Sequence, residues 1–341
     1  MIEELGLGLV RTNSPAKMGK WSSLAEKLGY DSVWIAEDYF QGGAFSIATA
    51  CALATNRVRI GIGVVNPFTR HPALVAMETA SLDILSKGRV TLGLGTGSPG
   101  WMRQMGIDFT APLSALREGS QIIRRLLQGE KLTFEGRCFS INGIQLDSPT
   151  YSQRVPIYLG VKGPQTLTLS GELLGQVADG VCLSILTSVP YVGFAKERIA
   201  KGIHKAASST AANSSKETNI AAYLPIVIDR NDEKDFAALR SYIAKYITLM
   251  GVQPILVEAG MTPERIGQFR DAAEQGKDPS NLVSDDLIET FGVAGSPEAC
   301  LSRLQDYIQA GVNTIIACEI PGIPIEVTAH SIAEHILPRL R

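Results

Sequence analysis

The sequence predicts an α/β protein in which the whole chain, residues 1–341, forms a single (β/α)8 barrel with insertions. Short apolar segments alternate with longer amphipathic segments from one end to the other, which is the pattern of repeated βα units around a parallel sheet. Eight such units fit this length as one barrel. A doubly wound sheet would have fewer strands and an early Gly-x-Gly-x-x-Gly turn.

The predicted strands are short and apolar on both faces, as expected for strands buried between a barrel interior and a layer of helices. Polar or glycine-rich residues follow each of them. The eight strands are Leu5–Val10, Ser32–Ile35, Val58–Val64, Arg89–Leu94, Val155–Leu159, Gly180–Leu183, Ile220–Ile228 and Thr314–Ala317.

The predicted helices fill the gaps between these strands, and their apolar residues recur at helical spacing. A last helix closes the chain. The helices are Ala16–Leu28, Ala44–Leu53, Pro72–Leu85, Leu113–Leu127, Pro164–Leu174, Tyr191–Ala206, Glu233–Met250, Pro297–Gln309 and Glu326–Leu340.

Two insertions interrupt the regular alternation. Residues 131–146 alternate polar and apolar side chains around Gly136 and Asn142-Gly143, so a small hairpin is expected there, with Asn-Gly as a favoured turn signal. Residues 252–286 are punctuated by proline and glycine and contain short helical pieces. We expect this second insertion to form a helical cap that partly covers the barrel mouth.

Composition excludes several functional classes. Hydrophobic residues make up 45% of the chain and charged residues only 19%, which describes a well-buried globular protein and not a disordered one. The net charge is -2 and the basic residues are scattered, which argues against nucleic acid or an anionic membrane surface as partner. A small molecule is therefore the expected partner.

The five cysteines are an odd number, lie far apart, and include no Cys-x-x-Cys pair or nearby histidine at metal-ligand spacing. We therefore expect no metal site and interpret the cysteines as buried thiols in a reducing compartment. The acidic start of the chain does not resemble a signal peptide, and no apolar run approaches the ~20 residues that span a bilayer. A cytoplasmic location is expected.

The carboxyl ends of the strands form the mouth of such a barrel, where active sites lie. Glu37 and Asp38 directly follow the second predicted strand, so we expect both to face the mouth. Two carboxylates held together tend to raise the pKa of one of them toward the range useful for general acid catalysis. The structural alternative is that Asp38 caps the next helix and Glu37 is solvated.

Glycine-rich segments occur at the ends of the third and fourth strands. Gly61 and Gly63 alternate within the third strand, which indicates a bulge or a flat group lying against the backbone. Simple barrel-corner geometry is the alternative. Thr96-Gly97-Ser98 follows the fourth strand and offers backbone amides and hydroxyls to an anion or a ring.

The fifth strand leads through Gly160-Val161-Lys162-Gly163-Pro164 directly into a helix. Free amides and the positive end of the helix dipole favour an anion at such a turn, and the lysine adds charge. Proline suits the first helical position. The segment therefore predicts a phosphate site, with an ordinary glycine turn as the alternative.

Taken together, these loops resemble the bacterial luciferase-like superfamily of flavin barrels, and within it the deazaflavin-dependent reductase branch. The resemblance covers nearly the whole chain. It is greatest to the methylenetetrahydromethanopterin reductases, which pass a hydride between reduced coenzyme F420 and a folate-like C1 carrier. The segments that carry it are Leu28–Ile35, Gly63–Pro72, Ser86–Gly97, Val155–Pro164 and Ala178–Val181.

The resemblance implies a cofactor site built from three loops. The third-strand bulge, with a non-prolyl cis peptide at Gly63-Val64, is expected to back the deazaflavin ring. The loop after the fourth strand would line the ring or its ribityl chain, and the turn after the fifth would receive the phosphate. The implied cofactor-binding residues are Gly63, Val64, Val65, Asn66, Thr96, Gly97, Ser98, Gly160, Val161, Lys162, Gly163 and Pro164.

The sequence departs from the family pattern at both acid–base positions. Gly8 stands where the close reductases carry a glutamate in the first strand, and Asp38 stands where the family has a histidine. Asp38, with Glu37 beside it, is our predicted catalytic residue. A hydride-transferring enzyme that uses coenzyme F420 is expected, and the resemblance implies a homodimer. An FMN-dependent monooxygenase and a non-catalytic flavin-binding barrel remain the alternatives.

Overall fold

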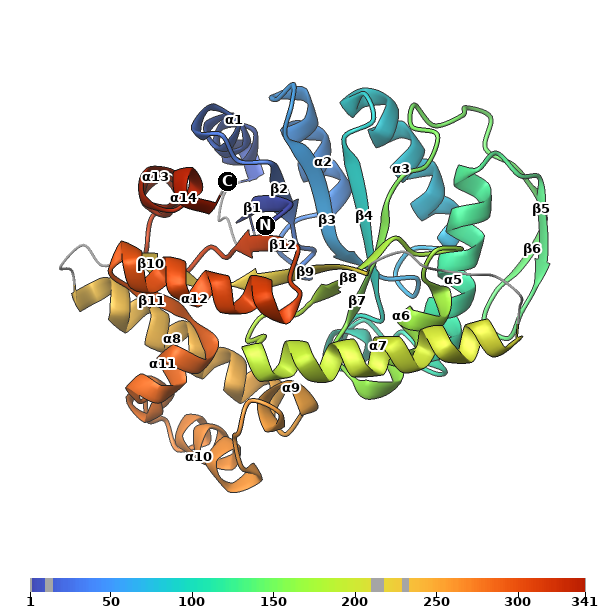
Figure 1. Cartoon of the computed structure of the whole chain (residues 1–341). Helices are drawn as coiled ribbons and strands as arrows, with labels where there is room; N and C mark the ends of the chain where they lie inside the picture. The colour runs from blue at the N-terminus through green and yellow to red at the C-terminus, as the bar shows by residue number, and fades with distance from the viewer. Residues whose placement is uncertain (1, 10–14, 210–217, 229–232, 341) are drawn as a thin grey trace.

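The computed structural model describes residues 2–9, 15–209, 218–228 and 233–340. Eight parallel strands close into a barrel in the order β1-β12-β9-β8-β7-β4-β3-β2, and helices pack around its outside (Figure 1). The predicted (β/α)8 barrel is therefore confirmed. Val10, the predicted last residue of the first strand, lies outside the described residues.

The strands and helices have the following bounds. The strands are β1 (Glu4–Leu9), β2 (Ser32–Ile35), β3 (Arg59–Val65), β4 (Val90–Gly95), β5 (Leu132–Glu135), β6 (Ser140–Ile144), β7 (Ile157–Val161), β8 (Gly180–Leu183), β9 (Asn219–Leu224), β10 (Ile226–Ile228), β11 (Val293–Gly295) and β12 (Thr314–Ala317). The helices are η1 (Pro15–Lys17), α1 (Met18–Leu28), α2 (Ala44–Leu53), α3 (Pro72–Ser86), α4 (Pro99–Gln104), α5 (Pro112–Leu127), α6 (Pro164–Leu173), α7 (Val189–Ser209), α8 (Glu233–Met250), α9 (Pro254–Val257), α10 (Pro263–Glu274), η2 (Pro279–Leu282), α11 (Asp285–Phe291), α12 (Pro297–Ala310), α13 (Ile325–His335) and α14 (Leu337–Leu340).

Local sequence signals account for where many helices begin and end. Proline occupies the first turn of α3, α6, α10 and α12, where its missing N–H breaks no helical bond. Thr262 and Ser296 accept hydrogen bonds from backbone amides in the first turns of α10 and α12. Gly29 and Gly311 end α1 and α12 in the left-handed conformation that glycine adopts without strain. Within the described ranges, no helix is both long enough and apolar enough to cross a membrane.

Two segments that were predicted as single elements each form two elements. Pro225 divides the predicted strand Ile220–Ile228, because proline has no N–H to contribute to a sheet ladder. β9 stays in the barrel, whereas β10 pairs in parallel with β11 outside it. The predicted last helix is likewise two helices, α13 and α14, separated at Ile336.

Residues 131–146 form the antiparallel pair β5 and β6, but the turn is not at Asn142-Gly143. The chain reverses at residues 136–139, where the amide of Gly136 donates to the carbonyl of Phe139 at 2.9 Å. The carboxylate of Glu118 accepts three backbone amides of this turn. Gly143 instead lies within β6 at φ 65°, opposite a shift in register, as glycine does at a β-bulge.

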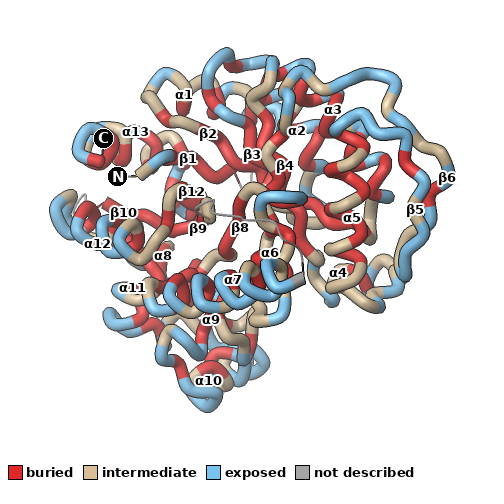
Figure 2. The backbone as a smooth tube through the Cα atoms, turned by 45° about the vertical axis from the view of Figure 1, so that its right-hand side comes forward, coloured by how far each residue is buried: buried red, intermediate tan, exposed pale blue. Residues whose placement is uncertain are grey.

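Residues 252–286 contain α9, α10 and η2, and both α10 and η2 pack against α8. Arg240 on α8 donates to the carbonyl of Val283 and pairs with Asp285 at 2.6 Å. Figures 1 and 2 show these helices on a different side of the barrel from the hairpin β5–β6. A lid function over the mouth stays a prediction for this segment.

Trp34 fills the centre of the barrel. Only 2% of its surface is exposed, and its indole N–H donates to the hydroxyl of Ser32 at 2.9 Å. A Cβ at Gly6 would lie 2.8 Å from the indole and one at Gly61 would overlap it, so both strands require glycine here. The flat group expected against Gly61 is therefore the protein's own indole.

Val64 fills the next layer of the barrel toward the mouth. Its methyl groups occupy the space that side chains would need at Gly93, Gly95 and Gly160, where a Cβ would lie 2.7–2.9 Å from them. Most of the length of the barrel strands is red in Figure 2, as expected for a barrel filled by side chains rather than an open pore. Trp34 and Val64 thus fill two successive layers of the barrel interior.

Arg89, which is half-buried, and Arg124, which is buried, tie the helices to the opposite, amino-terminal ends of the strands. Arg89 donates to four backbone carbonyl oxygens between residues 52 and 86. Arg124 on α5 donates to the carbonyls of Val155 and Val177 and pairs with Asp179 at 2.5 Å. These hydrogen bonds stabilise the closed barrel, because a buried guanidinium without hydrogen-bond partners costs free energy.

Gly61→Ala should lower the free energy of unfolding by about 1–3 kcal/mol, because the added methyl overlaps an indole that the closed barrel cannot move aside. Urea unfolding followed by circular dichroism measures this loss. Gly193→Ala on α7 is the matched control, because a Cβ there meets nothing within 4 Å. Equal stability of the two variants would contradict the packing of Trp34 against β3.

Candidate functional site at the barrel mouth

The predicted site residues follow four strands that are neighbours in the barrel, β2, β3, β4 and β7. Their carboxyl ends therefore form one continuous arc of the mouth. Contacts join the arc from strand to strand: the backbone of Gly97 lies against the side chain of Asn66, and that of Gly160 lies against Val64. The loop after β1 includes residues 10–14 and lies outside the described part of the chain.

β3 carries the interruption that the family resemblance implies. Its pairing with β4 shifts register between Ile62 and Val65, and the peptide bond between Gly63 and Val64 is cis. Tyr223 reaches this point from the far side of the barrel, and its hydroxyl donates to the carbonyl of Gly63 at 3.1 Å. Val64, Trp34 and Tyr223 together form the floor of the mouth.

Glu37 is buried, and both of its carboxylate oxygens have partners. One accepts the backbone amide of Ala44 at 3.1 Å, at the start of α2, and the other accepts from Arg70 at 2.6 Å. Arg70 lies over the ring of Phe45 and also faces Glu78 at 3.5 Å. The alternative in which Asp38 caps the next helix and Glu37 is solvated is therefore wrong. Glu37 itself accepts the hydrogen bond at the start of α2, and Glu37 is buried.

Asp38 is half-buried in the same loop, but its surroundings differ from those of Glu37. It lines a small cavity together with residues of β1, α1 and α2. Burial raises the pKa of Tyr223 well above its ordinary value, and two cysteine thiols and the charge of Asp38 raise it further. Asp38 thus lies beside a cavity, whereas Glu37 holds the loop to α2 and α3.

Asn66 organises the loop after β3. Its side-chain oxygen accepts the amides of Phe68 at 2.9 Å and Thr69 at 3.1 Å, and its nitrogen donates to the hydroxyl of Tyr39. That hydroxyl also shares a 2.9 Å hydrogen bond with Thr69. The ring of Tyr39 packs edge to face against Trp101 of α4, with 5.2 Å between the ring centroids. This contact connects the hydrogen-bond network to α4.

The loop after β4 requires glycine at its centre. Gly97 adopts φ 77°, and a Cβ there would lie 3.0 Å from Met102 and 3.1 Å from the amide of Asn66. Ser98 precedes α4, and its carbonyl accepts the amide of Met102 at 3.1 Å. Thr96 and Ser98 are both partly exposed at the mouth, as a role in lining a ligand requires.

The turn after β7 delivers the chain to the amino end of α6. Gly163 precedes the helix in an extended conformation, and its amide donates to the hydroxyl of Thr166 at 3.2 Å. The carbonyl of Lys162 accepts from the buried hydroxyl of Tyr191 at 2.7 Å, which fixes the turn against α7. The first amides of a helix have no carbonyl partner within it, so this rigid turn can present them to an anion.

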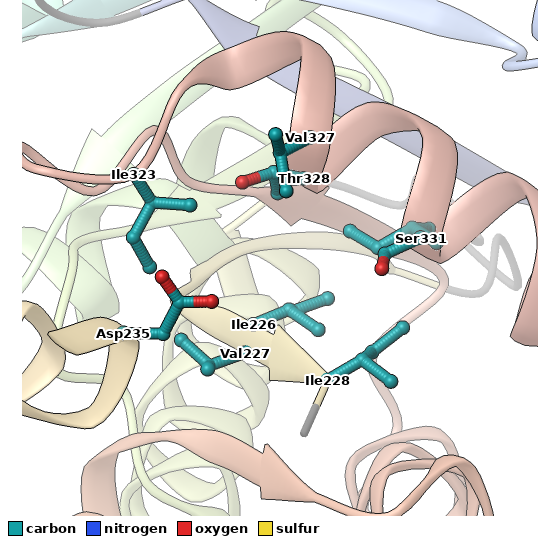
Figure 3. Close-up of a pocket in the computed structure, with 9 residues that line it drawn as sticks. Ile226, Val227, Ile228, Asp235, Ile323, Val327, Thr328 and Ser331 are labelled. Carbon is teal, nitrogen blue, oxygen red and sulfur yellow. The ribbon is translucent and has the colours of Figure 1, made fainter. Parts of the chain in front are cut away.

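A second, small pocket lies away from these loops, between β10 and α13 (Figure 3). Its walls are mostly aliphatic side chains, and the carboxylate of Asp235 turns toward them. None of the predicted site residues lines it. In the described part of the chain, no group of three or more His, Cys, Asp and Glu side chains is placed to hold a metal ion.

Comparison with known protein families gives one match over nearly the whole chain. Residues 3–314 match the family model described as luciferase-like monooxygenase. The chain belongs to this family. Membership agrees with the barrel, with the interrupted third strand and with the loops that the resemblance singled out.

Within this luciferase-like family, the chain is similar to enzymes that use a deazaflavin. It is 32% identical to the 5,10-methylenetetrahydromethanopterin reductase of Methanolobus tindarius over 94% of each chain. It is 25% identical to the F420-dependent glucose-6-phosphate dehydrogenase of Amycolatopsis mediterranei, over 96% of this chain and 95% of that one. The coenzyme F420-dependent tetrahydromethanopterin reductase of Methanopyrus kandleri superposes with a TM-score of 0.88 at 26% identity, over the whole of both chains.

Sequence reasoning missed three residues that shape this luciferase-like mouth: Tyr39, Arg70 and Tyr223. Tyr39 directly follows the carboxylate pair, and Arg70 lies inside a segment that carried the resemblance, so position alone could have indicated both. Tyr223 gave a weaker signal, as one of two tyrosines, with Tyr158, within the predicted apolar strands. Only the closed barrel brings its hydroxyl to β3.

Proposed function

We propose that this protein is a coenzyme F420-dependent oxidoreductase. It transfers a hydride between the reduced deazaflavin and a small organic substrate, for which a methylenetetrahydromethanopterin-like C1 carrier is the first candidate. The observation that carries the proposal is end-to-end similarity to F420-dependent enzymes, combined with an interrupted β3 and a phosphate-type turn at one mouth.

The residues at the mouth fit such a cofactor. Gly163 leaves open space beside the start of α6, since a Cβ there would meet only the Thr166 hydroxyl, at 3.7 Å. We assign the phosphate to this turn, with Gly160, Val161, Lys162 and Pro164 around it. Val64 and its neighbours on β3 would lie under the ring, and residues 96–98 would flank it. Reduced F420 supplies the hydride when bound, and the protein supplies orientation and electrostatics.

We assign proton handling to Asp38. Its carboxylate lies on the loop that Glu37 holds in place through Arg70 and the start of α2, so the two carboxylates have different roles. Asp38 would hold or deliver a proton at the mouth, while Glu37 keeps the loop fixed. This division replaces the paired catalytic role expected for Glu37 and Asp38 from the sequence.

FMN remains the alternative cofactor, because the matched family is described as luciferase-like monooxygenase and a phosphate turn serves either molecule. Titration of the purified protein with F420 and with FMN, followed by absorbance and fluorescence, separates the two. We expect saturable binding of F420 at a lower concentration than FMN. Binding of FMN alone would favour the FMN alternative, and binding of neither cofactor would overturn the proposal.

We further propose that the protein is a cytoplasmic homodimer, with α3 at the interface. Leu74, Met77, Ile84 and Leu85 expose 43–51% of their surface on one side of α3, while the opposite side of the helix is buried. A helix that is apolar all round is normally covered on every face, and large exposed apolar patches mark interaction sites. A second copy of the same face would cover it by two-fold symmetry.

Gly163→Val should weaken F420 binding about tenfold or more while leaving the melting temperature nearly unchanged. The extended backbone of Gly163, at φ -98° and ψ 157°, accepts valine without strain, so the added methyls act only on the ligand. Fluorescence titration gives the affinity. Lys162→Ala is the comparison and should weaken binding less, because backbone amides do most of the positioning. Unchanged affinity in Gly163→Val would remove the phosphate assignment.

Asp38→Asn should lower kcat about 100-fold with little change in melting temperature, because it removes the proton-handling group. Glu37→Gln should do the reverse and lower the free energy of unfolding by about 1–3 kcal/mol, since it removes the charge that faces Arg70. Steady-state oxidation of reduced F420 and thermal melts measure both. Full turnover in Asp38→Asn would end its catalytic assignment.

Met77→Asp should convert the dimer to a monomer, because it places a charge in the centre of the exposed apolar face of α3. Size-exclusion chromatography with light scattering measures the mass. Leu249→Asp on α8 is the matched control, because Leu249 is equally apolar and 66% exposed but lies on another helix. A dimer that survives Met77→Asp and dissociates with Leu249→Asp would place the interface elsewhere.

A further inference from the structure

Tyr223 spans the barrel at the level of the mouth floor. It lies on β9, and in the closed order of strands three others separate β9 from β3 in either direction. β9 and β3 therefore face each other across the barrel. The tyrosine hydroxyl crosses this interior and donates to the carbonyl of Gly63 at 3.1 Å.

The contact is possible only because residue 63 is glycine. A Cβ at Gly63 would overlap the Tyr223 hydroxyl and would lie 3.1 Å from the indole of Trp34. The tyrosine on one strand and the glycine on the opposite strand are thus matched in size. This second requirement for glycine is independent of the bulge itself.

The carbonyl of Gly63 lies where the β3–β4 ladder is interrupted, between the paired residues Ile62 and Val65. Buried carbonyls without a hydrogen-bond donor are rare because desolvation makes them costly. The Tyr223 hydroxyl supplies a donor at this point. Burial raises the pKa of Tyr223 well above its ordinary value, so the hydroxyl keeps its proton throughout the working pH range.

We propose that Tyr223 is a positioning residue of the hydride-transfer reaction: its hydroxyl orients the Gly63-Val64 peptide and so fixes the surface on which the cofactor ring lies. The inference rests on the proposed function, because the ring is assigned to β3 there. Hydride transfer depends steeply on the distance and angle between donor and acceptor atoms. Because β3 and the Tyr223 hydroxyl from β9 both hold the Gly63-Val64 peptide, the distance from the ring to the bound substrate would stay constant.

Tyr223→Phe tests the proposal, with Tyr158→Phe as matched control. Tyr158 is also an interior tyrosine, but its ring packs against Trp34, with 6.1 Å between the ring centroids. Its hydroxyl makes no hydrogen bond to the Gly63 carbonyl, which accepts from Tyr223. Each variant loses one hydroxyl from the same barrel. Wild-type protein is first titrated with F420, and failure at this step would overturn the proposed function rather than the role of Tyr223.

In Tyr223→Phe we expect an altered absorbance and fluorescence spectrum of bound F420. With methylenetetrahydromethanopterin as substrate, kcat should fall about tenfold or more while KM stays within about twofold. Tyr158→Phe should leave the spectrum and kcat near wild type. A wild-type spectrum in Tyr223→Phe, or equal changes in both variants, would overturn the proposal.

If Tyr223→Phe does not fold, incorporation of 3-fluorotyrosine at position 223 replaces it. This residue keeps the size of the side chain and changes the strength of the hydroxyl as a donor. We expect a shifted spectrum of bound F420 with an unchanged melting temperature. An unchanged spectrum would overturn the positioning role.

Discussion

The barrel depends on how its interior is filled, and above all on the indole of Trp34. Glycines on β1 and β3 leave the volume that this ring occupies, and Val64 then fills the layer above it against glycines of β4 and β7. A small barrel has room for side chains or for a ligand at any level, but not for both. The two filled layers therefore set the height at which the mouth begins, and every loop of the site is built above that level.

The residues that maintain the barrel and those that shape the mouth occupy opposite ends of the same strands. Arg89 and Arg124 bind backbone carbonyls near the amino-terminal ends, and Asp179 completes that set. Asn66, Gly97 and the turn before α6 lie at the carboxyl ends. In barrels of this type the first end serves stability and the second serves chemistry. Several segments that carried the family resemblance contain residues of both kinds.

The two neighbouring carboxylates illustrate how burial separates similar groups. Glu37 is enclosed and fully hydrogen-bonded, so its charge is compensated by Arg70 and by the start of α2. A buried ion pair of this kind is a poor proton carrier, because changing its charge would leave the partner uncompensated. Asp38 is half-buried and lines a small cavity instead. Neighbouring positions in the chain thus place one carboxylate in a closed ion pair and the other beside a small cavity.

The sequence by itself determined the fold class, most element positions and the set of loops that form the mouth. Alternation of short apolar strands with amphipathic helices is a local property, and so are the proline and glycine signals at helix ends. Local patterns failed where a single residue overrode them: Pro225 ended a strand inside an apolar run, and Gly143 formed a bulge where Asn-Gly indicated a turn.

Only the tertiary structure decided which groups meet. The indole beside Gly61, the reversal of roles between Glu37 and Asp38, and the hydrogen bond from Tyr223 to Gly63 all join residues on different strands or loops. Tyr223 and Gly63 are 160 positions apart in the sequence. Their contact depends on closure of the barrel, which sets β9 opposite β3, and closure is a property of all eight strands together.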